Sequence, residues 1–203
     1  MNDSSILRSS ITEALATFRT LSVLQPAMDD AAERVRRALL GGHKLLVCGN
    51  GGSAADAMHL ATEFVCRFRS DRRPYPALCL NASGGDLTAI GNDYAYEEVF
   101  ARQVAAFGRP DDVLLIFSTS GRSPNIVAAL EQAGVIGMDR IAFLGQDGGD
   151  CHGLAEVELL IPATTITARV QEAQKLLMHV LCEMVEPALA GGRTDRPDYQ
   201  TAS

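Results

Sequence analysis

The sequence predicts an α/β domain built on a doubly wound parallel sheet. Short apolar runs alternate along the chain with segments that repeat apolar residues at helical spacing, the pattern of strands joined by crossover helices. The runs are apolar throughout, as strands buried on both faces require. Two of them lead into loops of small and hydroxyl residues, which we expect at the carboxyl ends of strands, where such sheets bind ligands.

Two helices are predicted before the first strand. The first, residues 4–24, repeats apolar residues every three or four positions, at Ile11, Leu15, Phe18 and Leu21. Pro26 suits the first turn of the second helix, which ends at the glycine pair 41–42. We therefore expect residues 1–42 to form a helical hairpin that packs on the domain or on a partner subunit.

The stretch 44–67 organises the rest of the chain. An apolar strand, 44–48, leads into the loop Gly-Asn-Gly-Gly-Ser and then into a helix in which Ser53 is the expected N-cap. Unpaired amides and the helix dipole make such a loop an anion site. On this helix, His59 and Glu63 stand four residues apart and share one face.

The middle of the chain contains more loop than helix in this interpretation. Residues 67–73 are rich in arginine, and we interpret Arg67, Arg69, Arg72 and Arg73 as a solvated basic face, one of which could contact a phosphate. A short strand at 77–80 follows. Residues 81–86 and 91–94 are then expected as turns, and residues 97–107 as a helix ending at a glycine.

The second half repeats the strand–loop–helix pattern. A strand at 112–117 leads into a hydroxyl-rich loop, and Pro124 suits the first turn of the next helix, which runs to residue 133. Strands are predicted at 140–144 and 157–161, separated by a flexible loop, and the longest helix at 167–190. The domain therefore spans 43–190, and the polar tail 191–203 is expected to be disordered.

Composition excludes several classes of function. The formal net charge of −7 argues against broad nucleic-acid binding, which requires neutralising phosphates with basic residues. No apolar run reaches membrane-spanning length, and no basic segment leads into an apolar signal core. Five scattered cysteines, without a Cys-x-x-Cys pair, are expected to be reduced core thiols. We expect a cytoplasmic protein without membrane or nucleic-acid partners.

Several motifs together resemble the sugar isomerase (SIS) domain, and within it the phosphoheptose isomerases. The matching residues run in family order over residues 5–186: the loop 48–53, the run 56–59, Gly91-Asn92-Asp93, the loop 118–121, Gln171 and His179. The resemblance implies a flavodoxin-like three-layer sandwich. It also implies interconversion of sedoheptulose 7-phosphate and D-glycero-D-manno-heptose 7-phosphate, feeding heptose precursors of surface polysaccharide such as lipopolysaccharide. It implies a homotetramer with sites at subunit interfaces.

The resemblance also implies roles for individual residues. The first loop and the pair before Tyr94 would contact the sugar, through Asn50, Gly51, Gly52, Asn92 and Asp93. The second loop would hold the phosphate, through Ser118, Thr119, Ser120 and Ser123. The zinc ligands would be His59, Glu63, Gln171 and His179, with Glu63 and Gln171 also contacting substrate. Glu63 and His179 would form the acid–base pair. Ala168 and Gln174 depart from some members, which puts fine substrate positioning in question.

These residue types suit the chemistry. Aldose–ketose isomerisation moves a proton between two carbons through an enediol, so it requires a base at carbon and an acid at oxygen. Glu63 and His179 can supply them, and zinc can polarise the carbonyl. Gln171 and His179, however, are about 12 Å apart along a straight helix at 1.5 Å per residue. Both residues could bind one ion if their side chains were stretched, if the helix were bent, or if one of the ligands came from another subunit.

Simpler interpretations exist for each feature alone. A His-x-x-x-Glu pair is usually a surface pair, a glutamine on a helix is usually solvated, and a histidine between apolar neighbours is usually a satisfied core residue. Three other functions also remain open: a non-catalytic SIS protein such as those that bind the replication initiator, a sugar-phosphate sensor, and an isomerase of another ketose phosphate. The retention of Glu63 and His179 favours the enzyme.

Overall fold

One parallel five-stranded sheet forms the centre of the protein in the computed structural model, which describes residues 3–162 and 164–191. The strands are β1 (Leu45–Gly49), β2 (Ala77–Cys79), β3 (Val113–Ser118), β4 (Asp139–Leu144) and β5 (Val157–Leu160). Their spatial order is β2-β1-β3-β4-β5, with every pair parallel. The chain therefore winds outward from β1 in one direction and from β3 in the other, which confirms the predicted doubly wound sheet.

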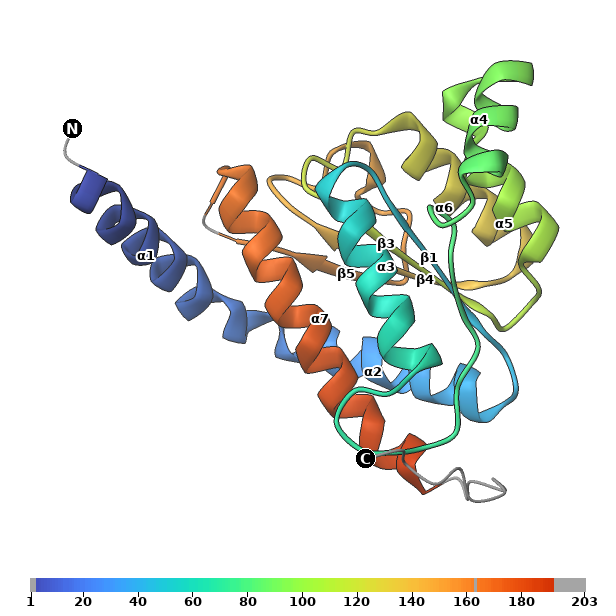
Figure 1. The fold of residues 1–203 in the computed structure, drawn as a ribbon, viewed down its shortest axis with the longest axis horizontal. Helices are drawn as coiled ribbons and strands as arrows, with labels where there is room; N and C mark the ends of the chain where they lie inside the picture. The colour runs from blue at the N-terminus through green and yellow to red at the C-terminus, as the bar shows by residue number, and fades with distance from the viewer. Residues whose placement is uncertain (1–2, 163, 192–203) are drawn as a thin grey trace, which may run out of the picture.

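Helices cover both faces of this sheet (Figure 1). The helices are α1 (Asp3–Thr20), α2 (Gln25–Leu40), α3 (Gly52–Val65), α4 (Gly84–Asp93), α5 (Ala101–Phe107), α6 (Pro124–Ile136) and α7 (Thr167–Ala190). Short 3-10 turns follow α1 (η1, Leu21–Leu24), α4 (η2, Tyr96–Glu98) and β4 (η3, Gly149–Cys151). Pro26 and Pro124 both lie in the first turn of their helices, as predicted, because a missing N–H costs nothing there.

The alternation of side chains along each strand divides the core into two layers. Leu45 and Val47 of β1 face the cluster formed with α2, α3 and α7, whereas Leu46 and Cys48 face the cluster formed with α5 and α6. Every residue of β1 and β3 is buried, as expected of strands with helices on both sides. The fold is a three-layer sandwich.

The two N-terminal helices differ in how far they join this sandwich. α2 buries Met28, Val35 and Leu39 in the core and packs on α7. α1 contacts α7 but extends away from the sandwich (Figure 1) and leaves apolar side chains in solvent, with Leu7 66% exposed. Ile6, Ile11 and Leu15 are exposed with it. Of the apolar stripe predicted for the first helix, Leu21 and Phe18 pack on the core, whereas Ile11 and Leu15 are not covered within one chain.

The structure corrects the prediction for residues 81–107. Gly84–Asp93 form a helix, α4, rather than two turns, and Ser83 caps it by accepting a hydrogen bond from the backbone N–H of Asp86 at 3.2 Å. The sequence did not indicate this helix because it contains Gly84, Gly85 and Gly91, and glycine has a low helix propensity. The single helix expected at 97–107 is instead η2 followed by α5. Neither α4 nor the break between η2 and α5 could be predicted from local sequence, because contacts with other elements stabilise them.

The N-cap prediction for α3 was also wrong. The helix begins at Gly52, and its N-cap is Gly51, with φ +56°, a conformation that glycine adopts without steric cost. Ser53 lies inside the first turn, is buried, and donates its backbone N–H to the carbonyl of Asn50 at 3.0 Å. The glycine pair thus starts the helix two residues earlier than a serine cap at position 53 would.

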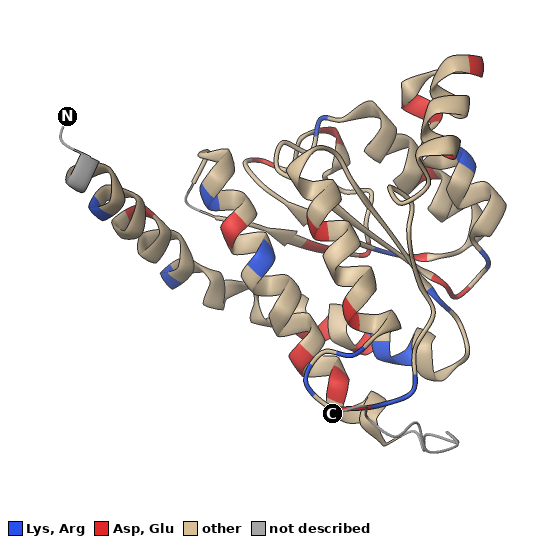
Figure 2. Cartoon of the chain, viewed as in Figure 1, with Lys and Arg blue, Asp and Glu red and all other residues tan. Residues whose placement is uncertain are grey.

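The arginine-rich segment that joins α3 to β2, residues 66–76, is called the strap below. It is not a wholly solvated basic face. Arg72 is only 3% exposed, and its guanidinium donates to the carbonyls of Glu63 at 2.6 Å and Phe64 at 3.0 Å. Arg67, Arg69 and Arg73 remain exposed, as predicted. Figure 2 shows the basic residues of this strap at one end of the molecule, beside acidic residues of α7. Burial of Arg72 was missed because its partners are carbonyls at a helix end.

Two further expectations concern the ends and surface of the chain. None of the described helices combines the length and the apolarity needed to cross a bilayer. The tail predicted to be disordered, 191–203, lies outside the described residues except for Gly191.

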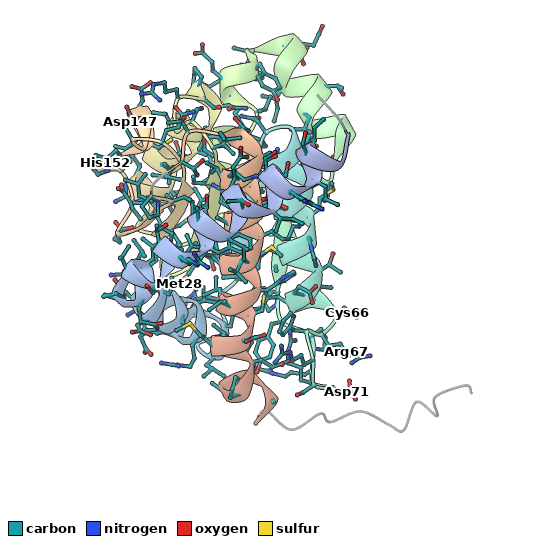
Figure 3. The ribbon with its side chains drawn as sticks, turned by 90° about the vertical axis from the view of Figure 1, so that its left-hand side faces the viewer. Met28, Cys66, Arg67, Asp71, Asp147 and His152 are labelled. Carbon is teal, nitrogen blue, oxygen red and sulfur yellow. The ribbon has the colours of Figure 1, made fainter. Side chains whose placement is uncertain are left out.

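Thiol reactivity tests the packing of the two core layers. All five cysteines are free; Cys66 is exposed beside Arg67 at the end of α3 (Figure 3), and the other four are buried. Burial raises the pKa of Cys151 and of Cys182 to about 12, and also raises the pKa of Cys48 and Cys79.

We expect Ellman's reagent to titrate one thiol rapidly in the native protein and all five in denaturant, because only an accessible thiolate reacts. Cys66→Ser should abolish the rapid phase. Rapid reaction of a second thiol in the native wild type would contradict the buried positions.

Candidate active site

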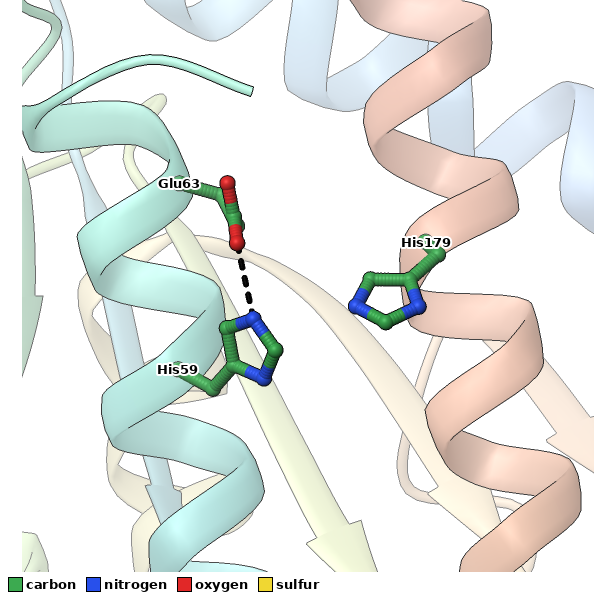
Figure 4. Close-up of side chains that lie close together, drawn as sticks. All are labelled: His59, Glu63 and His179. Carbon is green, nitrogen blue, oxygen red and sulfur yellow. Dashed lines mark hydrogen bonds and ion pairs between the residues drawn. The ribbon is translucent and has the colours of Figure 1, made fainter. Parts of the chain in front are cut away.

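α3 and α7 bring together three side chains that suit acid–base or metal chemistry. His59 and Glu63 lie one turn apart on α3, and His59 Nε2 is 2.7 Å from Glu63 Oε1 (Figure 4). His179 projects from α7 toward them, and its ring meets that of His59 edge-on at 5.1 Å between centroids. Phe68 of the strap stacks on the other side of His179 at 6.0 Å. The three side chains come from one chain.

The surroundings of His179 favour its neutral form. Burial lowers the pKa of His179 below its usual 6.5, and the neighbouring His59 and Lys175 lower it further, against the opposing effect of Glu63 and Glu183. Lowering the pKa keeps the imidazole uncharged at neutral pH. Its nitrogen lone pair is then available to accept a proton or to bind a metal ion.

The donor set fits a transition-metal ion. Among the described residues, His59, Glu63 and His179 each offer one ligand atom, and these atoms lie within 4.8 Å of one another. Two imidazole nitrogens and a carboxylate oxygen are ligands that zinc accepts. Gln171 lies two turns before His179 on α7, and a Cβ added at Gly52 would be 2.3 Å from its amide nitrogen. Its side chain therefore packs on the first loop.

A pocket of about 500 Å³ opens beside these residues between α1, α3 and α7. Its polar lining consists of Asp56, Gln171, Glu172, Lys175 and His179, and Gly52 forms part of its wall. The sequence analysis assigned no role to Lys175 or to Asp56. The ammonium of Lys175 lies 2.6 Å from Asp56 Oδ1 and 3.0 Å from His59 Nδ1.

The two loops expected to bind an anion enclose a second, smaller cavity of about 50 Å³. The lining residues are Asn50, Ser53, Phe117, Ser118, Thr119, Ser120 and Ser123. Ser118 Oγ accepts the backbone N–H of Gly121 at 3.0 Å, and Ser120 Oγ accepts that of Arg122 at 3.2 Å. Each hydroxyl thus uses a lone pair internally and retains its own proton for an anion. The N-terminus of α6 adds its dipole.

Gly121 allows the second loop to pack closely on the loop after β4. It has φ +65°, and a Cβ there would lie 1.8 Å from the carbonyl oxygen of Gly148. No other residue type fits this contact, so Gly121 sets the shape of the hydroxyl loop.

Two side chains that sequence reasoning missed hold Asn50 in the small cavity. Asn125, buried in the first turn of α6, exchanges amide hydrogen bonds with Asn50 at 2.8 and 3.0 Å. The hydroxyl of Tyr96 donates to Asn50 Oδ1 at 3.2 Å. Asparagine directly after a first-turn proline was the available signal for Asn125.

The structure does not bring Asn92 and Asp93 into either cavity. Both lie exposed in the last turn of α4, and the Asn92 amide donates to Asp93 Oδ1 at 2.8 Å. Neither residue lines the 500 Å³ pocket or the 50 Å³ cavity.

Comparisons with known proteins agree with this architecture. The SIS domain family matches residues 9–145. The chain is similar to a phosphoheptose isomerase of Clostridium acetobutylicum, with 48% identity over 80% of this chain and 83% of that one. It is also similar to solved phosphoheptose isomerases from Francisella tularensis (TM-score 0.88, 35% identity) and Neisseria gonorrhoeae (TM-score 0.86, 36% identity). Each alignment covers 92% of this chain and 100% of the other.

Removal of one hydroxyl tests the anion cavity. We expect Ser120→Ala to weaken binding of inorganic phosphate by about 10-fold or more, since a hydrogen bond to a charged group contributes about 1.5–3 kcal/mol. Isothermal titration calorimetry can measure this, with Ser70→Ala on the exposed strap as the control. Equal phosphate affinity in Ser120→Ala and wild type would place the anion elsewhere.

Proposed function

The chain belongs to the phosphoheptose isomerases of the SIS-domain family, and from this membership we propose that it interconverts D-sedoheptulose 7-phosphate and D-glycero-D-manno-heptose 7-phosphate. The observation that carries the proposal is the meeting of His59, Glu63 and His179 beside the 500 Å³ pocket, on the helix α3 whose first turn also lines the small hydroxyl-rich cavity and on the facing helix α7. A phosphate held at one end of the substrate would fix the position of its reacting end.

Glu63 acts as the base at carbon in this proposal. It removes the proton from C2 of the aldose, and the proton of the C2 hydroxyl passes to the carbonyl oxygen at C1, which yields the enediolate form of the enediol. The same carboxyl group then returns a proton to C1, and the deprotonated oxygen at C2 becomes the ketose carbonyl. Its position suits this role, because the side chain is only 17% exposed and lies beside His59 and His179 between two helices.

His179 moves the protons at oxygen. Its lowered pKa keeps it neutral in the resting protein, so it must receive a proton from one sugar hydroxyl before it delivers one to the other oxygen. A single imidazole serving O1 and O2 in turn accounts for both proton transfers at oxygen. Glu63 and His179 together therefore return to their starting states after one turnover.

The remaining proposed contacts hold the substrate. The loop residues Asn50, Gly51 and Gly52 contact the sugar with Gln171, and Ser118, Thr119, Ser120 and Ser123 hold the phosphate. Asn92 and Asp93 reach the sugar of a neighbouring subunit, a role that suits their exposure on α4. Each site would therefore lie at an interface between two subunits.

We propose zinc as the resident metal. His59, Glu63 and His179 would hold it, with Gln171 as a fourth ligand if its amide leaves Gly52. Two imidazoles and one carboxylate support this choice. When bound, zinc supplies Lewis-acid polarisation of the sugar carbonyl.

The same family membership suggests an oligomeric state and a cellular compartment. We propose a homotetramer in which residues 1–42 form a helical extension of the domain 43–190, with the apolar stripe of α1 covered by another copy. Exposed Ile6, Leu7, Ile11 and Leu15 support this. Five unpaired thiols suit the reducing cytoplasm, where the product would feed heptose precursors of surface polysaccharide such as lipopolysaccharide.

Solvent exchange tests the isomerase proposal. In deuterated water the wild type should place deuterium at C2 of the aldose, because the enediol exchanges its carbon-bound proton with solvent. Glu63→Gln retains the shape of the side chain but loses the base, so kcat should fall by about 10²-fold or more while binding of substrate persists. NMR of the product and steady-state kinetics measure both.

Control measurements separate loss of chemistry from loss of fold. Glu33→Gln, on the exposed surface of α2, should exchange and turn over like the wild type. Wild type that binds the heptose phosphate without turnover or exchange would leave a sugar-phosphate-binding protein instead.

Substitution on α1 tests the assembly. We expect Ile11→Asp to reduce the tetramer to smaller species in sedimentation velocity experiments, because a buried, unpaired carboxylate opposes association. Ser9→Asp places the same charge elsewhere on α1 and should leave the tetramer intact. A monomeric wild type at micromolar concentration would remove the interface proposal.

A further inference from the structure

Lys175 has an unusual position beside the three candidate ligands. It is one of two lysines in the sequence, and it lies on α7 midway between Gln171 and His179. Its ammonium contacts two groups of α3, Asp56 Oδ1 at 2.6 Å and His59 Nδ1 at 3.0 Å. Asp56 is buried, so its carboxylate requires a charged partner, and Lys175 supplies it.

The contact with His59 determines which ring nitrogen carries the proton. An ammonium group donates hydrogen bonds and cannot accept them. Nδ1 of His59 must therefore present its lone pair to Lys175, which leaves the proton on Nε2, facing Glu63 Oε1 at 2.7 Å. The result is a continuous series of hydrogen bonds from Lys175 through His59 to Glu63.

This tautomer is the opposite of the one that a histidine adopts when it binds metal through Nε2, the nitrogen that faces Glu63 here. A histidine that binds metal through Nε2 carries its proton on Nδ1 and donates it, commonly to a carboxylate. Asp56 is a carboxylate three residues before His59 on the same helix, and it contacts the same ammonium. Lys175 thus bridges Nδ1 of His59 and the carboxylate of Asp56 and contacts both.

We propose that Lys175 is a positioning residue that holds His59 in the metal-free tautomer and thereby weakens zinc binding. The inference rests on the zinc site of the proposed function. For the metal to bind, Nε2 of His59 must release its proton and the Lys175 ammonium must leave Nδ1, retaining Asp56 as its partner. The positive charge of Lys175 close to a divalent cation opposes binding further.

Zinc affinity of the metal-free protein, measured by competition with a chelator at one fixed pH, tests this proposal. Lys175→Met removes the ammonium but retains much of the apolar stem, and Lys175→Arg retains the charge. We expect Lys175→Met to bind zinc about 10- to 100-fold more tightly than wild type, the range over which partners of metal ligands alter affinity. Lys175→Arg should remain within a few-fold of wild type.

Arg36→Met is the matched control for the loss of one positive charge. Arg36 pairs with Glu33 on α2, and its side chain is 37% exposed, compared with 36% for Lys175. This variant should bind zinc as the wild type does, because its charge lies outside the pocket.

NMR provides a readout that is independent of affinity and activity. Long-range ¹H–¹⁵N correlation spectra of the metal-free protein, which contains four histidines, distinguish the two tautomers of His59. The proposal requires the Nε2–H form in the wild type and a shift toward the Nδ1–H form in Lys175→Met.

The outcomes separate this inference from the proposed zinc site. Wild type that binds zinc, with Lys175→Met within twofold of it, would overturn the role of Lys175 and leave the zinc site standing. The Nδ1–H form of His59 in the metal-free wild type would do the same. Failure of both proteins to bind zinc would remove the zinc site and this inference together.

Discussion

The spacing between α3 and α7 is the constraint on which the candidate site depends, because each helix carries only part of it. The strap after α3 maintains this spacing. Buried Arg72 donates to the last carbonyls of α3, including that of Glu63, and the hydroxyl of Tyr75 donates to the carbonyl of Leu189 in α7 at 3.1 Å. Glu186 of α7 accepts the backbone N–H groups of residues 69 and 70. The strap thus joins the ends of both helices.

The candidate acid–base residues lie on helices, whereas the N–H and O–H donors lie in close-packed loops. Proton transfer at defined atoms requires precise positions, which regular helices provide, and His59, Glu63 and His179 all lie on helices. Anion binding requires converging N–H and O–H groups, and the loops after β1 and β3 provide them beside the start of α6. The first loop connects these parts, since Gly52 lines the large pocket and its neighbours line the small cavity.

α7 contributes more polar side chains to the candidate site than its sequence alone suggests. Gln171, Lys175 and His179 repeat every four residues, so one ridge presents an amide, an ammonium and an imidazole to α3. These groups meet Gly52, the Asp56–His59 pair and Glu63 in turn. The pairing of the two helices therefore determines which polar groups meet in the pocket, and a substitution at one position acts on its neighbours.

The sequence by itself determined the doubly wound sheet, the two small-residue loops after β1 and β3 and the bounds of α7, because apolar runs, glycine-rich loops and helical periodicity are local patterns. It also indicated His59 and Glu63 as a pair, since residues four apart on a helix must share a face. Only the tertiary structure decided that His179 joins them within one chain, that Arg72 is buried, that residues 84–93 form a helix and that Lys175 contacts His59. Each of these depends on contacts between elements distant in sequence, where the packing of backbone carbonyls and charges outweighs local propensity.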